Sequence, residues 1–327
     1  MAVLITGGAG YIGGTTARSF IKRGEQVVIL DDLSKSRISS VPKEAVFYEG
    51  KINNKDIIKQ ITDEYNITAC LHFAAFIEVG ESVKDPHKYF YNNTASSLEL
   101  FSALIECGVK KIVFSSTAAV YGEPQYTPID EEHIKNPTNP YGLSKYFIEK
   151  ILESFSLSHG VTYAALRYFN ACGADGTGNG EDHRPESHLI PLILQVPLGK
   201  REKIFIYGDD YPTKDGTCIR DYIHVSDLAS AHLAAYDYLM NGGSSVALNL
   251  GNGNGFSVKE VIESAKRVTG CHIQCDIAPR RAGDPSVLVA SSEKAKRILN
   301  WEPQYKSIDY MISSAWDWHK NNPEGYL

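Results

Sequence analysis

The stretch Ala2-Val3-Leu4-Ile5-Thr6-Gly7-Gly8-Ala9-Gly10-Tyr11-Ile12-Gly13 decides the fold of this chain. An apolar run meets glycines spaced as Gly7-x-x-Gly10-x-x-Gly13, where a helical pattern begins. Such glycines allow a tight turn between a strand and a helix, and they let a pyrophosphate approach the helix N-terminal amides. The stretch therefore predicts the first βα turn of a dinucleotide-binding sheet.

Asp31, at the end of the next apolar run, indicates which dinucleotide is bound. A carboxylate at that position binds the adenosine ribose hydroxyls and repels a 2′-phosphate. Asp32 adds to the repulsion, whereas the nearby cations Lys35 and Arg37 would suit a phosphate. We expect NAD and keep NADP as the alternative.

Short apolar runs alternate with longer helical patterns through the first half of the chain, as is typical of βαβ units around a parallel sheet. The predicted strands are 3–5, 27–30, 46–48, 70–73, 112–114 and 163–166, and the predicted helices are 12–23, 55–65, 88–107 and 141–158. After about residue 170 the pattern changes to a glycine-rich loop followed by a helix at 189–198.

These patterns predict an α/β fold, with a Rossmann-like doubly wound parallel sheet and a smaller mixed α/β C-terminal substrate lobe. We expect residues 1–170 to form the NAD-binding domain and residues 171–327 the smaller lobe. Segments near 221–255 are expected to return to the first domain.

Two polar segments favour an active site at the carboxyl edge of this sheet. Ser115-Ser116-Thr117 follows the strand at 112–114, and Tyr141 and Lys145 lie one turn apart on a predicted helix. Lowering a phenol pKa from about 10 to about 7 requires roughly 4 kcal/mol. A cation about 4 Å away, at a dielectric of about 20, supplies on the order of 4 kcal/mol. We therefore expect Lys145 to lower the pKa of Tyr141, which would act as a base, and Thr117 to bind the same substrate oxygen.

Composition narrows the class of partner. The chain has 327 residues, 43% of them hydrophobic, and a net charge of -6 without a basic run, which argues against nucleic acid. No apolar stretch approaches the about 20 residues that span a membrane, and no signal peptide is predicted. Six cysteines without a Cys-x-x-Cys pair suit free thiols in a reducing cytoplasm, and no metal site is predicted.

Together, the glycine turn, Ser115-Ser116-Thr117 and Tyr141-x-x-x-Lys145 resemble the extended short-chain dehydrogenase/reductase family. Later segments, at 167–170, 220–225 and 278–284, resemble its UDP-glucose 4-epimerase (UDP-galactose 4-epimerase) group. The resemblance implies a cytoplasmic, homodimeric isomerase of galactose metabolism with tightly bound NAD. Such an enzyme interconverts UDP-glucose and UDP-galactose through transient oxidation to a 4-keto sugar.

The resemblance also implies roles for individual residues. It assigns catalytic roles to Tyr141, Lys145 and Thr117. The residues that resemble cofactor contacts are Gly7, Gly10, Tyr11, Ile12, Gly13, Asp31, Phe73, Ala74, Asn92, Ser115, Lys145 and Tyr168. Those that resemble substrate contacts are Thr117, Tyr141, Asn170, Leu189, Arg220, Tyr222, Arg281, Asp284 and Leu288. Lys51, Ile77 and His188 depart from the family pattern, which leaves their contacts open.

Dehydratases of this family carry acidic residues directly after the hydroxyl residue, because elimination of water needs an extra acid and base. Ala118 and Ala119 stand there, which favours epimerisation. Leu288 is expected to leave room for weaker activity on UDP-N-acetylglucosamine and UDP-N-acetylgalactosamine. An epimerase of UDP-glucuronate or UDP-xylose and a non-catalytic NAD-sensing protein remain the alternatives.

Overall fold

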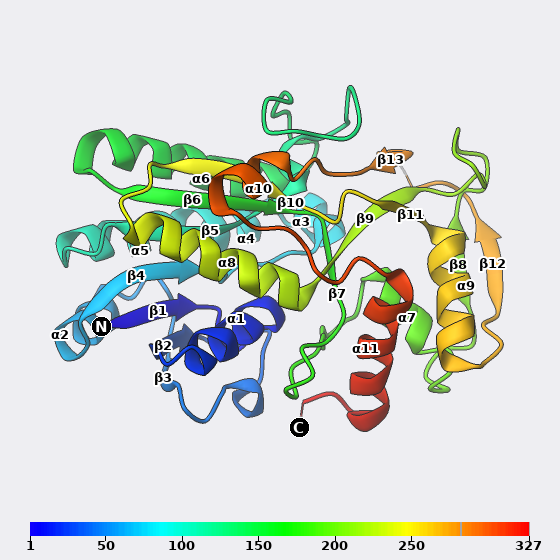
Figure 1. The fold of residues 1–327 in the computed structure, drawn as a ribbon, viewed down its shortest axis with the longest axis horizontal. Helices are drawn as coiled ribbons and strands as arrows, with labels where there is room; N and C mark the ends of the chain where they lie inside the picture. The colour runs from blue at the N-terminus through cyan, green and yellow to red at the C-terminus, as the bar shows by residue number, and fades with distance from the viewer. Residues whose placement is uncertain (282, 327) are drawn as a thin grey trace.

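The computed structural model describes residues 1–281 and 283–326, and Figure 1 shows a large helix-covered sheet beside a smaller group of strands and helices. The strands are β1 (Ala2–Thr6), β2 (Gln26–Asp31), β3 (Val46–Glu49), β4 (Ile67–His72), β5 (Lys111–Thr117), β6 (Thr162–Tyr168), β7 (Asn170–Cys172), β8 (Ile204–Tyr207), β9 (Ile219–His224), β10 (Val246–Leu250), β11 (Gly255–Ser257), β12 (Cys275–Ala278) and β13 (Val287–Leu288). The α-helices are α1 (Tyr11–Lys22), α2 (Lys55–Glu64), α3 (Val79–Lys84), α4 (Pro86–Tyr89), α5 (Ser96–Glu106), α6 (Pro140–His159), α7 (Leu189–Leu194), α8 (Val225–Met240), α9 (Val258–Thr269), α10 (Glu293–Leu299) and α11 (Ile308–Asn321).

The large sheet has seven strands in the order β10-β6-β5-β4-β1-β2-β3, and every neighbouring pair is parallel. From β1 the chain builds β2 and β3 on one side and then crosses to β4, β5 and β6 on the other. Ligands of such sheets bind outside the carboxyl ends of the strands, where the order reverses. The predicted doubly wound parallel sheet is confirmed.

Helices cover both faces of this sheet because its central strands are apolar on both sides. On one face α1 packs against α8, around Phe20, Ile29 and Leu228. On the other face α2, α5 and α6 bury a second cluster that includes Ile58, Phe101 and Ile148. The large sheet therefore lies between two apolar layers, and its polar strand ends remain free to form a site.

The helix predicted at 88–107 is continuously helical in the structure as far as Glu106, but its middle is wound as a π-helix. A π-helical segment, Phe90–Ala95, separates α4 from α5. Buried Asn93 explains the local irregularity: its side chain binds both the N–H and the C=O of Phe76, at 2.9 Å each, and donates to Ser144 Oγ at 3.2 Å. Such π-helical turns are frequent at functional sites.

The smaller group of strands and helices gathers around its own apolar core, which includes Ile193, Val261 and Met311. Strand β9 lies between β11 and β13 and also pairs with β7, whereas β8 pairs with β12. Of the segments near 221–255, α8 and β10 pack with the large sheet, and β9 and β11 lie in the smaller one. Helix α7 ends at Leu194, short of the predicted 198, in a turn that closes at Gly199.

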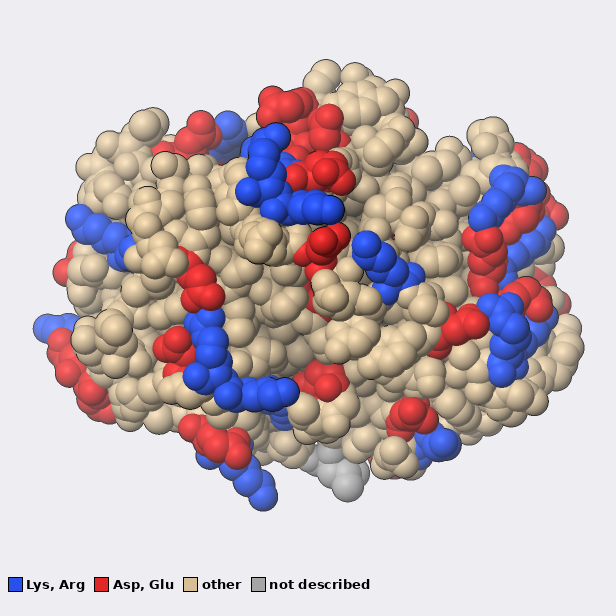
Figure 2. All heavy atoms as spheres, viewed as in Figure 1, with Lys and Arg blue, Asp and Glu red and all other residues tan. Residues whose placement is uncertain are grey.

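On the face drawn in Figure 2, lysine and arginine side chains are interspersed with acidic ones, and they form no continuous band there. Among the described residues, we find no helix with the length and apolar character needed to cross a membrane.

Candidate active site

A cleft of ≈ 1660 Å³ lies at the carboxyl ends of the large sheet and extends to the smaller lobe. Every site residue predicted from the sequence lines this cleft, from the glycine turn of α1 to Leu288 of β13. The three residues whose contacts were left open, Lys51, Ile77 and His188, line it too. The fold thus brings side chains from positions 7 to 288 into one cavity.

Thr117 and Tyr141 meet because the start of α6 packs directly on the turn after β5. Asn139 caps this helix by accepting the Gly142 N–H at 2.9 Å, and Pro140 occupies its first turn. A Cβ atom at Gly142 would lie 2.5 Å from the Ala119 carbonyl oxygen, so only glycine permits this approach. The hydroxyl of Thr117 accepts the Ala119 N–H at 3.2 Å, which leaves its own proton free to be donated.

Lys145, one turn further along α6, is buried and points to the end of β5. Its Nζ donates to the Ser115 carbonyl at 2.9 Å and lies 5.0 Å from the centre of the Phe114 ring. Burial lowers the pKa of Lys145 to about 7, because an ammonium loses its hydration there. The neighbouring hydroxyls of Ser115 and Tyr168 are hydrogen-bonded to each other.

The expectation that the pKa of Tyr141 is lowered does not hold in this structure. Burial raises the pKa of the phenol, and a hydrogen bond with Thr117 only partly opposes the rise. A nearby ammonium lowers the pKa of a phenol, but the loss of water around the phenolate raises it. In this structure the ammonium of Lys145 is directed to a backbone carbonyl.

The glycine turn has the close backbone packing that a dinucleotide site requires. Gly7 has φ +72°, and a Cβ atom at Gly13 would lie 2.3 Å from the Gly7 carbonyl oxygen. The carboxylate of Asp31 accepts N–H groups from Ala9 at 3.1 Å and Leu33 at 2.9 Å, so it links this turn to the end of β2. Burial raises the pKa of Asp31, while these hydrogen bonds oppose the rise. The glycine turn and the carboxylate of Asp31 fit an NAD molecule.

The far end of the cleft carries the cations that a diphosphate needs. Arg220 and Asp284 form an ion pair with each other, so Asp284 orients the guanidinium of Arg220. Arg281 lies 4.0 Å from the centre of the Tyr207 ring. The Asn170 amide donates to the Asp221 carbonyl at 2.9 Å, and Leu288 pairs in register with Arg220.

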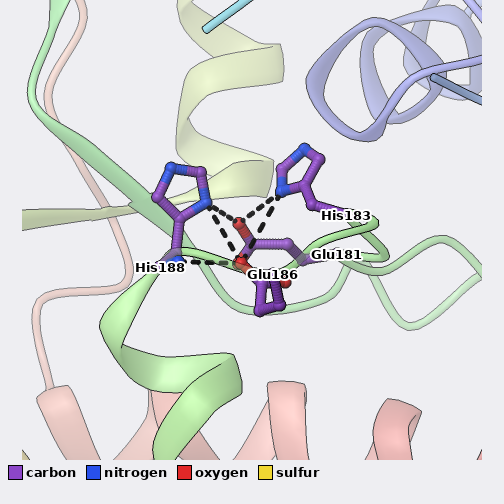
Figure 3. Close-up of side chains that lie close together, drawn as sticks. All are labelled: Glu181, His183, Glu186 and His188. Atoms are coloured by element: carbon purple, nitrogen blue, oxygen red, sulfur yellow. Dashed lines mark hydrogen bonds and ion pairs between the residues drawn. The ribbon is translucent and has the colours of Figure 1, made fainter. Parts of the chain in front are cut away.

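Two groups of cleft residues were not predicted from the sequence. Phe205 and Tyr207 are the exposed members of β8 and line the cleft, and the alternation in Ile204–Tyr207 was their only signal. The second group is Glu181, His183 and Glu186, which lie beside His188 in the loop before α7, as Figure 3 shows. Its signal was the run of acidic and histidine residues within the predicted loop.

A Rossmann-like domain with a tyrosine and a lysine one helical turn apart at the carboxyl edge of its sheet defines the extended short-chain dehydrogenase/reductase class. The family model described as GDP-mannose 4,6 dehydratase matches residues 4–314. The UDP-glucose 4-epimerase of Halalkalibacterium halodurans is 53% identical over 327 residues, which cover 100% of this chain and 98% of that relative.

Solved structures agree with these matches. A crystal structure of a UDP-glucose 4-epimerase matches with a TM-score of 0.98 at 48% identity, covering 100% of both chains. The UDP-glucose 4-epimerase of Bifidobacterium longum, crystallised with NAD+ and UDP, matches with a TM-score of 0.94 at 38% identity, again over 100% of both chains. The chain belongs to the UDP-glucose 4-epimerases of the extended short-chain dehydrogenase/reductase family.

Proposed function

We infer that this chain interconverts UDP-glucose and UDP-galactose by NAD-dependent epimerisation at C4 of the sugar. The observation that carries the inference is the meeting of Thr117 and Tyr141 in the cleft, beside Ala118 and Ala119. The relatives named above share this activity by name, and one of them was crystallised with NAD+ and UDP.

Tyr141 is proposed to take the proton of the sugar 4-hydroxyl and later to return it, while Thr117 hydrogen-bonds the same oxygen. NAD held by the glycine turn and Asp31 would supply a reversible hydride acceptor for C4. Lys145 stabilises the phenolate against the burial that raises the pKa of Tyr141. With only methyl groups at Ala118 and Ala119, no acid or base is available there for elimination of water.

The remaining predicted contacts are divided between the two ends of the cleft. Residues 1–170, joined by α8 and β10, are proposed to form the NAD-binding domain, and the rest of 171–327 the smaller nucleotide-sugar-binding lobe. The proposed cofactor contacts are Gly7, Gly10, Tyr11, Ile12, Gly13, Asp31, Phe73, Ala74, Asn92, Ser115, Lys145 and Tyr168. The proposed substrate contacts are Thr117, Tyr141, Asn170, Leu189, Arg220, Tyr222, Arg281, Asp284 and Leu288.

The test is incubation of the purified protein with a panel of UDP-sugars, with the products identified by NMR. UDP-glucose should give UDP-galactose and no 4-keto-6-deoxy sugar. A 6-deoxy product would point to a dehydratase, and preferential turnover of UDP-glucuronate or UDP-xylose to a different epimerase. No turnover of any sugar by NAD-loaded protein would favour a non-catalytic NAD sensor.

We further propose a slower epimerisation of UDP-N-acetylglucosamine, which depends on Leu288. This side chain packs against Val120, Tyr121 and Ile129 just beyond the catalytic turn, and it lines the cleft. Leucine is shorter than tyrosine and leaves space for an acetamido group. A misfit in a packed pocket costs about 1–3 kcal/mol, roughly 5- to 150-fold in rate. Leu288→Tyr should abolish the slower activity and spare the faster; an equal loss of both would show that Leu288 is structural.

The chain is also proposed to act as a homodimer in the cytoplasm, in galactose metabolism. The dimer proposal rests on large apolar side chains that α6 and the segment from Phe90 to Glu106 expose: Tyr91 is 58% exposed, Leu98 39% and Phe147 41%. Exposed apolar side chains on helices that pack against each other are typical of association surfaces. Light scattering after size exclusion should give a molar mass of twice that of the chain. In Phe147→Glu the measured mass should fall toward that of the monomer.

A further inference from the structure

Four side chains of the loop before α7 converge on one point at the wall of the cleft, as Figure 3 shows. They are Glu181, His183, Glu186 and His188, and their donor atoms all lie within 4.8 Å of one another. Glu181 Oε1 is 2.5 Å from His188 Nδ1 and 3.2 Å from His183 Nδ1. Glu186 Oε1 is 3.7 Å and 4.0 Å from the same two nitrogens.

We propose that this cluster binds a divalent transition-metal ion, with Zn²⁺ as its prototype. Zn²⁺ takes imidazole nitrogens at about 2.0–2.1 Å and carboxylate oxygens at about 2.0–2.2 Å, usually in a tetrahedron. Tetrahedral donors at those bond lengths are about 3.4 Å apart. The separations of 2.5 to 4.0 Å bracket this value, so small rotations of the side chains would complete the site.

The charges of the cluster match a divalent ion. Glu181 is buried with a side-chain exposure of 5%, and the carboxylate of Glu186 is similarly buried at 7%. Two buried carboxylates this close are costly unless positive charge compensates them. Without an ion, the ion pair with His188 compensates Glu181. A divalent cation would neutralise both carboxylates, and His188 would release its proton on binding, because the neutral imidazole is the form that ligates a metal.

The orientation of His183 is a second observation. Its Nδ1 is directed at Glu181 Oε1, 3.2 Å away, without the geometry of a hydrogen bond. A metal ion held between the two groups would use the lone pair of that nitrogen.

Glu186 is held in place by the backbone. Its Oε1 accepts the N–H groups of Ser187 at 2.7 Å and His188 at 2.8 Å. Such hydrogen bonds fix the orientation of a ligating carboxylate.

The position of the cluster indicates a structural role. The ring of His183 packs edge-on against Tyr11 of α1, with centroids 6.5 Å apart, and His188 directly precedes α7. Four protein ligands close the coordination shell, as in structural zinc sites. The bound ion would therefore fix the loop between the glycine turn and the nucleotide-sugar end of the cleft, without taking part in epimerisation.

The test is metal titration of the full chain, purified with chelator and with its bound cofactor retained. Cys107 and Cys271 are exposed thiols that could bind metal, so both are first changed to serine. Co²⁺ should then bind at one equivalent per chain with the visible absorption of a tetrahedral ion, and Zn²⁺ should displace it.

His183→Asn and Glu186→Gln should each weaken Co²⁺ binding at least about 10-fold, because losing even an outer-shell partner costs 10–100-fold. His272→Asn, at an exposed histidine outside the cluster, is the matched control and should bind as the parent does. Circular dichroism verifies that each variant folds. If one variant fails to fold, Co²⁺ binding by the other still tests the proposed site. Absence of Co²⁺ binding, or binding that survives both variants, would show that the cluster is only an ion-pair network. Because UDP-glucose turnover is measured on the same samples without added metal, that result would leave the proposed epimerase function standing.

Discussion

At the residue scale, the site depends on opposing effects at Tyr141. Burial raises the pKa of its phenol, and the hydroxyl of Thr117 lowers it. Burial also lowers the pKa of Lys145 to about 7, so near neutral pH its ammonium is easily gained or lost. A phenolate at Tyr141 and an ammonium at Lys145 stabilise each other, which favours forming both together.

Tyr141→Phe should lower turnover of UDP-glucose by at least about 100-fold, the lower end for loss of a positioned acid or base. The phenyl ring fills the same space, so UDP affinity measured by calorimetry should stay near that of the parent. Turnover within a few-fold of the parent would remove Tyr141 from the proposed mechanism.

Lys145→Met should lower turnover and move the rising part of the pH–rate profile to higher pH. The sign follows from charge: a nearby cation lowers the pKa of a phenol, so its removal leaves only the burial that raises the pKa of Tyr141. The measurement is kcat against pH with saturating UDP-glucose. A profile that does not move would contradict the assigned role of Lys145.

At the scale of elements, the start of α6 joins helix stability to catalysis. The side chain of Asn139 caps this helix, and Tyr141 lies in its first turn. Gly142 lets that turn pack on the carbonyl of Ala119. The position of the phenol thus depends on how well this helix end is held.

Asn139→Ala should lower the free energy of unfolding by about 1 kcal/mol, the usual cost of losing an N-cap. It should also lower kcat, because the turn that carries Tyr141 frays. Ser307→Ala, which removes the N-cap of α11, is the control: it should lower stability and leave kcat unchanged. Denaturant unfolding and UDP-glucose turnover are the two measurements. If both variants changed kcat equally, the cap of α6 would have no specific role in catalysis.

At the scale of the whole molecule, the C-terminal segment is tied to the proposed cofactor end of the cleft. The hydroxyl of Tyr326 donates to Asn179 Oδ1 at 2.7 Å. The amide of buried Asn179 donates to the Tyr11 carbonyl and to Thr15 Oγ1, at 2.7 Å each. Tyr326 near the C-terminus thus stabilises, through Asn179, the first turns of α1 that follow the glycine turn.

Tyr326→Phe should therefore speed the loss of NAD, which the purified parent is expected to carry without any being added. The measurement is NAD released over time during dialysis, by enzymatic assay, with initial turnover unchanged when NAD is in excess. Tyr310→Phe, at an exposed tyrosine of α11, should lose NAD as the parent does. If all three proteins retained NAD equally, the contacts of Tyr326 would not limit the release of NAD.

The sequence by itself determined the sheet, the glycine turn, the family and the residues proposed to hold cofactor and substrate, because local patterns and fixed spacings carry that information. Short apolar runs that alternate with helical patterns predicted β1 to β6. The four-residue spacing of Tyr141 and Lys145 predicted that they lie one helical turn apart. Long-range packing decided the rest. Only the structure showed that residues 90–95 of the helix predicted at 88–107 are π-helical and that burial raises the pKa of Tyr141. It alone showed that the side chains of Glu181, His183, Glu186 and His188 converge, because the packing of this loop, and not the spacing of its residues, sets the directions of its side chains.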